Sequence, residues 1–578
     1  MQPVKRKLTI IAQDPAVRID DRIVTEQVEV PYERLEPGPW GHRVQIIDYD
    51  ASTDHFETPP SKGFYGKKTP VDPFQHSDNA TLLTDPQFHA QNVYAIVMRV
   101  LSRFEFALGR RVGWSFRSHQ LKVAPHAFSD ANAFYSKDDE GLFFGHFPGR
   151  NGTIYTCLSH DVVAHETTHA LLDGLRERYV DPSSPDQAAF HEGFADVVAL
   201  LSVFSLKHVV GKLVDRAQGA GGAPGSSGPS DRIMKAQVGR DELRKSVLMG
   251  LAEEMGSELS PIRGKPLRSS LDLPKSRTLL KDDPEFLEPH RRGEVFVAMV
   301  MNAFLDVWSE QLGTLGDEHT TSYDRDRVVQ EGAGAADYLL TMLIRALDYC
   351  PPVHLVFGDF LSAALTADCE IRPDDERYKF RKHLLKSFDQ YGVMPTSKGT
   401  AREPGLWEQP GPDLDYSGIH FESLVRDPDE VFRFLWQNQE KLKLYPHTYS
   451  EVLSVRPCLR VGPEGLLLRE TVAEYFQRLE VPASELARLR IGVNKPLQMK
   501  PDTTVKLYGG GALIFDQFGR LRFNITNRLD NATLQNERLQ YLWDYGYFTK
   551  HAATARPFAA LHRKRATGAY TRITEQWL

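Results

Sequence analysis

The stretch that decides the fold is DVVAHETTHALLDG, which occupies residues 161–174. It is apolar along much of its length, and two histidines, His165 and His169, stand four positions apart. Residues four apart lie on the same face of a helix, one turn from each other. We therefore expect a buried helix over Ser159–Asp173, ended by Gly174, that points two imidazoles in one direction.

Two imidazoles on one helical face can hold a zinc ion, and the intervening Glu166 can take the proton of a water on that ion. His-Glu-x-x-His also occurs by chance, and two surface histidines are the plain alternative. The apolar flanks favour the metal site, because a buried helix that carries these polar groups must give them partners. The sequence predicts His165 and His169 as zinc ligands and Glu166 as general base.

A third ligand is expected from the next helix, which starts at a capping box, SPDQ, at residues 184–187. This helix contains Glu192, and catalytic zinc takes three protein ligands and one open position. Asp196, one turn later, can accept the free ring N–H of His165 and fix its tautomer. A solvated acidic face is the alternative, but apolar residues surround the pair. We predict Glu192 as the third ligand and Asp196 as its neighbour behind His165.

The combination of HETTH with a later E-x-x-x-D resembles the gluzincin metallopeptidases, in particular the thermolysin and fungalysin families. Asn132-Ala133-Phe134-Tyr135 is similar to the edge strand that those families carry before the zinc helix. The resemblance implies that Asn132 and Ala133 pair with the backbone of a substrate, as an added strand does. It covers roughly residues 85–391 and is strongest over roughly 130–200.

The resemblance implies two further catalytic side chains. The segment EPHRRGEVF, at residues 288–296, is similar to a fungalysin-type H-x-x-G-E-V segment, which implies that His290 stabilises the oxyanion. The alternative is an ordinary polar histidine at a helix start. A thermolysin-type tyrosine corresponds to Tyr179, one position earlier than the family spacing, and Arg178 competes for that role.

The resemblance also implies an α+β fold: a two-lobed thermolysin-like metallopeptidase domain, with a β-rich N-terminal lobe and an α-helical C-terminal lobe, followed by a mixed α/β C-terminal domain. The expected divisions are 1–80 (β-rich part of the catalytic domain), 81–210 (zinc-binding core), 211–392 (helical lobe with a Gly/Ser/Pro-rich loop at 218–230), 393–425 (linker) and 426–578 (C-terminal domain of unknown role). Within the last part, residues 513–525 are typical of a β-hairpin turning near Gly519.

Composition bounds the class of protein. The chain has 578 residues, 41% hydrophobic and 25% charged, with a formal net charge of −7. This length predicts at least two domains, and the charge argues against a nucleic-acid or membrane-surface partner, which needs a concentrated positive field. No run of apolar residues is long enough to span a membrane, and the apolar run 8–12 is too short for a signal peptide. We expect a cytoplasmic protein and leave non-standard secretion open.

The four cysteines are far apart in sequence and form no C-x-x-C pair. We expect reduced, mostly buried thiols and neither a disulfide framework nor a cysteine-ligated metal. The acidic run Asp138, Asp139 and Glu140 offers a calcium site, although a solvated turn is the simpler interpretation.

The sequence as a whole predicts a metalloendopeptidase that holds one zinc ion and hydrolyses a peptide or protein substrate. Two alternatives stay open: an intracellular zinc-containing regulatory or binding protein with an occluded cleft, and a gluzincin aminopeptidase. The G-x-M-E-N strand of the aminopeptidases is absent from the sequence. The oligomeric state carries no prediction.

Overall fold

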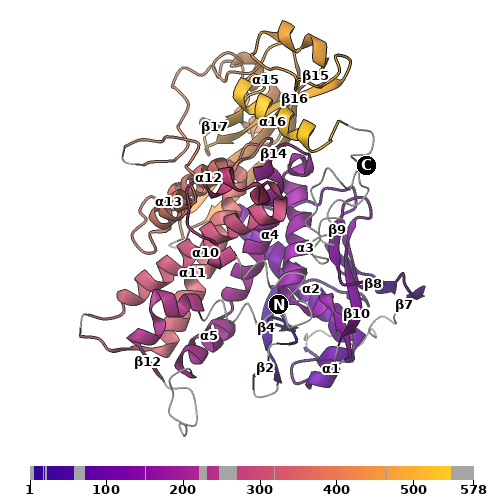
Figure 1. The fold of residues 1–578 in the computed structure, drawn as a ribbon, viewed down its shortest axis with the longest axis vertical. Coiled ribbons are helices and arrows are strands. Elements are labelled where there is room, and N and C mark those ends of the chain that lie inside the picture. The colour runs from indigo at the N-terminus through magenta and orange to yellow at the C-terminus, as the bar shows by residue number, and fades with distance from the viewer. Residues whose placement is uncertain are drawn as a thin grey trace.

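The computed structural model describes residues 5–16, 18–19, 22–56, 72–149, 152–219, 231–245, 270–317, 319–401, 403–462 and 465–548. The chain mixes helices with several small sheets. Figure 1 shows strands β8, β9 and β10 at one side, a body of long helices in the middle, and the C-terminal strands at one end. The predicted Gly/Ser/Pro-rich loop at 218–230 lies largely outside the described residues.

The N-terminal region is built of short strands, as predicted. Strands β1 (Lys5–Ile11) and β4 (Thr25–Pro31) pair antiparallel. Two smaller antiparallel pairs are β2 (Arg18–Ile19) with β3 (Arg22–Ile23), and β6 (Tyr49–Asp50) with β7 (His55–Phe56). The buried apolar side chains of β1 and β4 join the main core, so this region is part of the same body as the helices.

A five-stranded sheet follows, with β5 (Val44–Ile46), β8 (Leu121–Ser129) and β10 (Gly141–Gly149) parallel to one another. Strands β9 (Ala133–Ser136) and β11 (Gly152–Tyr155) each pair antiparallel with a different part of β10. Within this sheet β9 pairs with β10 alone and is an edge strand. Strand β9 also packs beside the predicted zinc helix, so the edge strand lies against the helix that carries the histidine pair.

The helical body contains the two helices that the sequence predicts around the histidines and Glu192, together with further helices. Its members are α1 (Asn79–Thr84), α2 (Pro86–Leu108), α3 (His160–Leu175), α4 (Pro185–Phe204), α5 (Lys207–Gly219), α9 (Leu279–Asp282), α10 (Pro289–Gly313), α11 (Arg325–Ala346), α12 (Phe357–Ile371) and α13 (Phe380–Gln390). A short strand pair, β12 (Arg232–Met234) with β13 (Ser322–Asp324), lies between α5 and α11.

One helix boundary was predicted wrongly. Gly174 does not end α3; the helix continues to Leu175 and Arg176 is its C-cap. A Cβ on Gly174 would collide with the carbonyl oxygen of Gly113, so the glycine lets the helix approach a loop. The glycine is therefore explained by close backbone contact, a role that its position in the sequence does not reveal.

Helix α10 is the apolar centre of the body. It packs against α4, α11 and α13, and its side chains from Val295 to Leu305 are buried. By length and composition it could cross a membrane, yet 83% of its apolar window is buried inside the molecule. Helices α4 and α5 are long and apolar enough to cross a membrane only when they are taken together across a bend of 79°.

The C-terminal region folds as a four-stranded antiparallel sheet in the order β14 (Tyr449–Val461), β15 (Leu467–Pro482), β16 (Thr504–Phe515) and β17 (Leu521–Asn527). The predicted hairpin is confirmed: β16 and β17 join at a turn in which Gly519 has φ 76°. One face of the sheet enters the main core; the other packs on α14 (Phe421–Leu424) and α15 (Pro428–Gln437), and α16 (Ala532–Asp544) covers one end.

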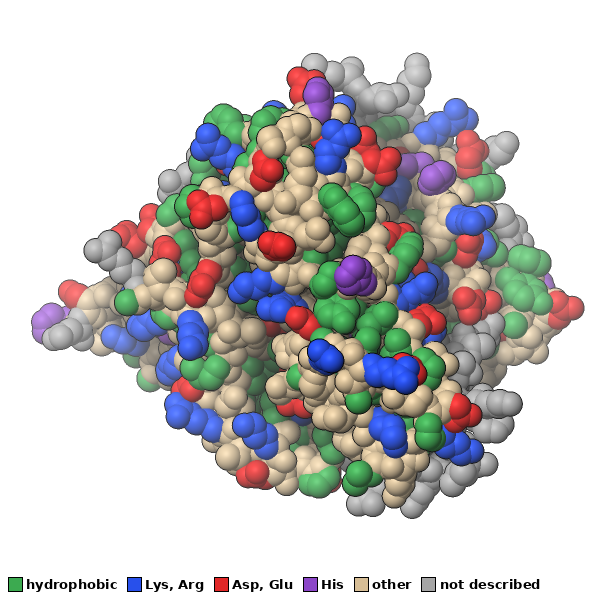
Figure 2. Space-filling view, turned by 90° about the horizontal axis from the view of Figure 1, so that it is seen from above, with side chains coloured by type: hydrophobic (Ala, Val, Ile, Leu, Met, Phe, Trp, Pro, Cys, Tyr) green, Lys and Arg blue, Asp and Glu red, His purple; other side chains and the backbone are tan. Residues whose placement is uncertain are grey.

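On the surface seen from above, acidic and basic side chains are interspersed (Figure 2).

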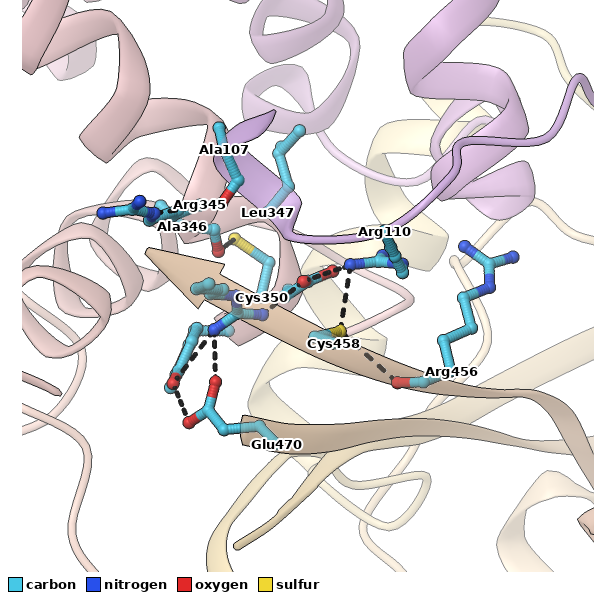
Figure 3. Close-up of polar contacts among 12 residues, drawn as sticks. Ala107, Arg110, Arg345, Ala346, Leu347, Cys350, Arg456, Cys458 and Glu470 are labelled. Carbon is cyan, nitrogen blue, oxygen red and sulfur yellow. Dashed lines mark hydrogen bonds and ion pairs between the residues drawn. The ribbon is translucent and has the colours of Figure 1, made fainter. Parts of the chain in front are cut away.

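Buried ion pairs join this sheet to the helical body (Figure 3). Asp348, just after α11, accepts hydrogen bonds from Arg110 at 2.5 and 2.6 Å and from Arg460 of β14 at 2.5 Å. Arg460 also pairs with Glu470 of β15, which accepts from the Tyr349 hydroxyl at 2.5 Å. Burial opposes ionisation of Asp348, but the two guanidinium groups outweigh it and lower its pKa. The charges balance two against two, which burial of ions requires.

Candidate metal centre

Helix α3 carries the two histidines on one buried face. His165 and His169 are fully buried, and their Nε2 atoms lie 2.8 Å apart. The hydroxyls of Thr167 and Thr168 donate to the carbonyl oxygens one turn earlier, at 2.7 Å each. The threonine hydroxyls therefore find their hydrogen-bond acceptors within α3. The two imidazoles are left to contact a neighbouring helix.

That neighbour is α4, and it places Glu192 against both rings. Its Oε2 lies 3.6 Å from His165 Nε2 and its Oε1 lies 3.6 Å from His169 Nε2. One ligand atom from each of the three residues lies within 4.8 Å of the others, and all three side chains are buried. Two imidazole nitrogens and one carboxylate oxygen suit zinc and related transition metals. The predicted ligand set is therefore brought together as a site that fits a metal ion.

Each histidine has a partner on its outer nitrogen. His165 Nδ1 lies 2.7 Å from Asp196 Oδ1, the contact that the sequence predicts. His169 Nδ1 lies 2.8 Å from His191 Nδ1, a contact that it does not. Burial lowers the pKa of His191 to about 4, so that ring is neutral and can accept the proton of His169. Both outer contacts leave Nε2 as the metal-facing lone pair, and such partners fix the tautomer of a ligand.

Glu166, the predicted general base, is fully buried on α3 between the two ligand histidines. Its position in the helix is fixed by theirs, because all three residues belong to one turn of α3. A carboxylate so placed can receive a proton at the metal site.

His290, predicted from the resemblance alone, lies at this centre. Its Nε2 is 3.5 Å from Glu192 Oε2 and its Nδ1 is 2.8 Å from Glu288 Oε1. Glu288 is the N-cap of α10, and its other oxygen accepts from the Arg291 N–H at 2.8 Å. Burial opposes ionisation of Glu288, yet His290 and these hydrogen bonds lower its pKa. One carboxylate thus caps the helix and turns the His290 ring so that Nε2 faces the metal ligands.

Two glycines bring His290 to Glu192. Helices α4 and α10 cross at Gly193 and Gly293, where a Cβ on Gly193 would lie 2.8 Å from the Gly293 carbonyl oxygen. Arg292 also donates to Asp186 Oδ1 at 2.5 Å and ties α10 to the start of α4. The backbones approach because neither residue has a side chain, and as a result Glu192, next to Gly193, meets His290, about one turn before Gly293.

Tyr179 does not have the predicted catalytic placement. It is buried, and its hydroxyl donates to the carbonyl oxygen of Pro351 at 2.9 Å. The competing candidate, Arg178, pairs with Asp181 at 3.2 Å and lies over the Phe476 ring of β15. Tyr179 thus contacts the segment between α11 and α12, and Arg178 contacts the C-terminal sheet, so these contacts do not support the catalytic assignment of either residue.

The predicted substrate strand lies where it was expected. Asn132 and Ala133 are buried at the start of β9, beside α3. Asn132 Oδ1 accepts from the Ala133 N–H at 2.9 Å, and the Asn132 carbonyl accepts from Gly145 N–H at 2.9 Å. These contacts fix the two residues at the start of β9.

The acidic run proposed for calcium is engaged in ordinary contacts. Asp139 accepts from the Ser136 hydroxyl at 2.7 Å, and Glu140 pairs with Lys122 at 3.2 Å. These contacts are those of a turn at the surface, which is the simpler of the two interpretations.

The four cysteines are free thiols, three of them buried. Cys157, however, lies with His89 and His126 in a second group of potential metal ligands, all buried and within 4.8 Å of one another. The sequence gives no sign of this group, because its members come from three separate elements. The sequence analysis expects no cysteine-ligated metal, and this group is a place in the fold where such a metal could bind.

Comparisons with known proteins add no relative: no family model matches the chain, and no curated protein matches it significantly. The site is therefore interpreted from its own geometry.

Proposed function

We propose that this chain is a zinc-dependent metalloendopeptidase of the gluzincin type, with a thermolysin-like two-lobed arrangement around the centre between α3 and α4. The observation that carries the proposal is the convergence of His165, His169 and Glu192, with Glu166 on the same turn of α3. A bound zinc ion would polarise the scissile carbonyl and make water acidic enough to react near neutral pH. Glu166 is not needed to bind metal, so its presence favours chemistry over a purely structural ion.

The roles of the side chains follow from their positions. Glu166 takes the proton of the attacking water and passes it to the leaving amine. His290, held by Glu288 through Nδ1, donates from Nε2 to the oxygen that becomes negative in the transition state. Strand β9 offers an edge on which an extended peptide can lie beside α3.

The test is Glu166→Gln in the full chain, with Glu537→Gln, on the exposed face of α16, as the matched control. Zinc content is measured by elemental analysis, and cleavage of a mixed peptide library by mass spectrometry. We expect internal cuts from the wild type and the control, and loss of cleavage with unchanged zinc in Glu166→Gln. Full cleavage by Glu166→Gln would remove it as the base. Trimming from the N-terminus would favour the aminopeptidase alternative.

Burial of the centre favours a second candidate function. His165, Glu166 and His169 are fully buried in this conformation, and a substrate must reach them. A regulatory or binding protein with an occluded cleft has this property permanently. Zinc in the purified protein together with no cleavage of the library would favour this candidate.

A further inference from the structure

A second cluster of metal-binding side chains lies where three elements meet. His89 belongs to α2, His126 to β8, and Cys157 to the 3-10 turn η1 (Thr156–Leu158), which directly precedes α3. All three side chains are buried. The reaction proposed above uses none of them.

We propose that His89, His126 and Cys157 hold a second zinc ion, which fastens α2 and β8 to the start of α3. This site is separate from the candidate metal centre and does not depend on the peptidase proposal.

The geometry of the two rings supports this assignment. His89 Nδ1 and His126 Nε2 lie 2.8 Å apart, the same separation as between His165 Nε2 and His169 Nε2. Around a tetrahedral zinc ion with bonds of about 2.0–2.1 Å, two ligand nitrogens stand about 3.3 Å apart. The ligand atoms of the three residues, including Cys157 Sγ, lie within 4.8 Å of one another. Small side-chain movements would bring all three to bonding distance from one ion.

Asp48 sets the His126 tautomer. Its carboxylate oxygens lie 2.8 and 3.1 Å from His126 Nδ1. The proton is therefore on Nδ1, and Nε2 presents its lone pair toward His89 and Cys157. A carboxylate on the outer nitrogen of a ligand histidine is the usual support of a metal site, and Asp196 makes the same contact with His165 at the first centre.

Charge and donor type favour zinc. A buried thiolate needs a nearby cation, and the Asp48 carboxylate behind His126 adds a second negative charge to this cluster. A divalent ion balances the Cys157 thiolate and the Asp48 carboxylate, with both imidazoles neutral. One sulfur and two nitrogens suit zinc rather than magnesium or calcium, which prefer oxygen. Water would complete the fourth position.

The competing arrangement contains no ion. His89 Nδ1–H would then donate to His126 Nε2, and His126 Nδ1–H to Asp48, with Cys157 a protonated thiol beside the pair. Metal content separates the two arrangements.

The first test measures zinc per chain in four full-length proteins after dialysis against a weak chelator. We expect two zinc ions in the wild type, one in Cys157→Ser, one in His169→Asn, and two in Cys350→Ser, the control for a buried cysteine elsewhere. One zinc ion in the wild type, lost in His169→Asn and kept in Cys157→Ser, would overturn the second site. Copper in place of zinc, with an intense blue colour, would overturn the choice of metal.

The second test works even if Cys157→Ser folds poorly. Cobalt is bound in place of zinc by the His169→Asn protein, which keeps only the proposed site. We expect a strong near-ultraviolet band from thiolate-to-cobalt charge transfer, and a lower melting temperature after treatment with a strong chelator. The absence of both signals would overturn the proposal. Asp48→Asn should keep the band and weaken metal affinity by about 10–100-fold. An inactive wild type with both zinc ions would refute the peptidase and leave this site standing.

Discussion

The crossing of α4 and α10 at Gly193 and Gly293 gives a sharp prediction. In Gly193→Ala the new methyl group would lie 2.8 Å from the Gly293 carbonyl oxygen and 3.2 Å from its Cα. Carbon atoms in contact prefer about 3.5–4.0 Å, so the helices must separate by roughly half an ångström. Overpacking of this kind costs about 1–3 kcal/mol, while alanine in a helix returns about 1 kcal/mol relative to glycine.

The expected net effect of Gly193→Ala is a loss of about 1 kcal/mol in the free energy of unfolding. The matched control is Gly313→Ala at the end of α10, where a Cβ meets nothing within 4 Å. That variant should gain up to about 1 kcal/mol, because only the helix propensity changes.

Both variants are compared by equilibrium unfolding in urea, and their zinc content and peptidase turnover are measured beside it. We expect Gly193→Ala to keep its zinc and lose turnover, since separation of the helices moves His290 away from Glu192 while His165 and His169 stay on α3. A Gly193→Ala protein as stable as Gly313→Ala would refute the tight crossing. Unchanged turnover would refute the positioning of His290 by this contact.

Three further predictions address single carboxylates and the buried ion pairs. Asp196→Asn should weaken zinc binding by about 10–100-fold, measured by chelator competition, because its ligand histidine loses a charged partner; unchanged affinity would contradict this role. Burial, with the charge of nearby Asp161, raises the pKa of Asp14 to about 7, so ionisation costs stability progressively from about pH 4 to pH 7. Asp14→Asn should therefore be more stable than the wild type by a few kcal/mol at pH 8 and no more stable near pH 4, as urea unfolding at both pH values will show. Arg460→Ala should cost about 3–5 kcal/mol in the same assay because it leaves buried carboxylates unbalanced, whereas Arg478→Ala, on an exposed pair of the same sheet, should cost less than about 1 kcal/mol; equal losses would contradict the network.

The parts of the site that the sequence predicts are those set by local geometry. His165 and His169 share a helical face whatever surrounds them, and Asp196 follows Glu192 by one turn of the same helix. The only tertiary assumption was that the next helix returns beside the first. A buried helix with several polar groups leaves few other solutions, because each group needs a partner.

The failures concern side chains whose direction depends on distant elements. Tyr179 follows the zinc helix closely in sequence, yet its hydroxyl reaches Pro351 because the 3-10 turn η2 (Glu177–Val180) aims it there. Cys157, His89 and His126 meet only once α2, β8 and η1 are packed. No spacing rule encodes contacts of that kind, and pairwise motifs such as C-x-x-C describe only sites formed by one local segment.

The C-terminal sheet was expected as a separate domain with a linker before it. Its hairpin is predicted correctly, since alternation and the turn at Gly519 are local signals, whereas β14 and β15 are not predicted. The main core also includes Cys458, Val472 and Ile514 of this sheet. The sequence does not predict this, because the pattern of a buried strand residue is the same whether it packs on helices of its own domain or on another part of the chain.

This shared core has a consequence for how the molecule comes apart. A chain stopped before β14 would expose the apolar surface that now faces the sheet and would strand Asp348 and Arg110 without Arg460. The helical body and the sheet should therefore melt in a single cooperative transition, and a protease that nicks the connecting segment should leave the two pieces bound to each other. Strands β14 to β17 thus belong to the scaffold around the helical body.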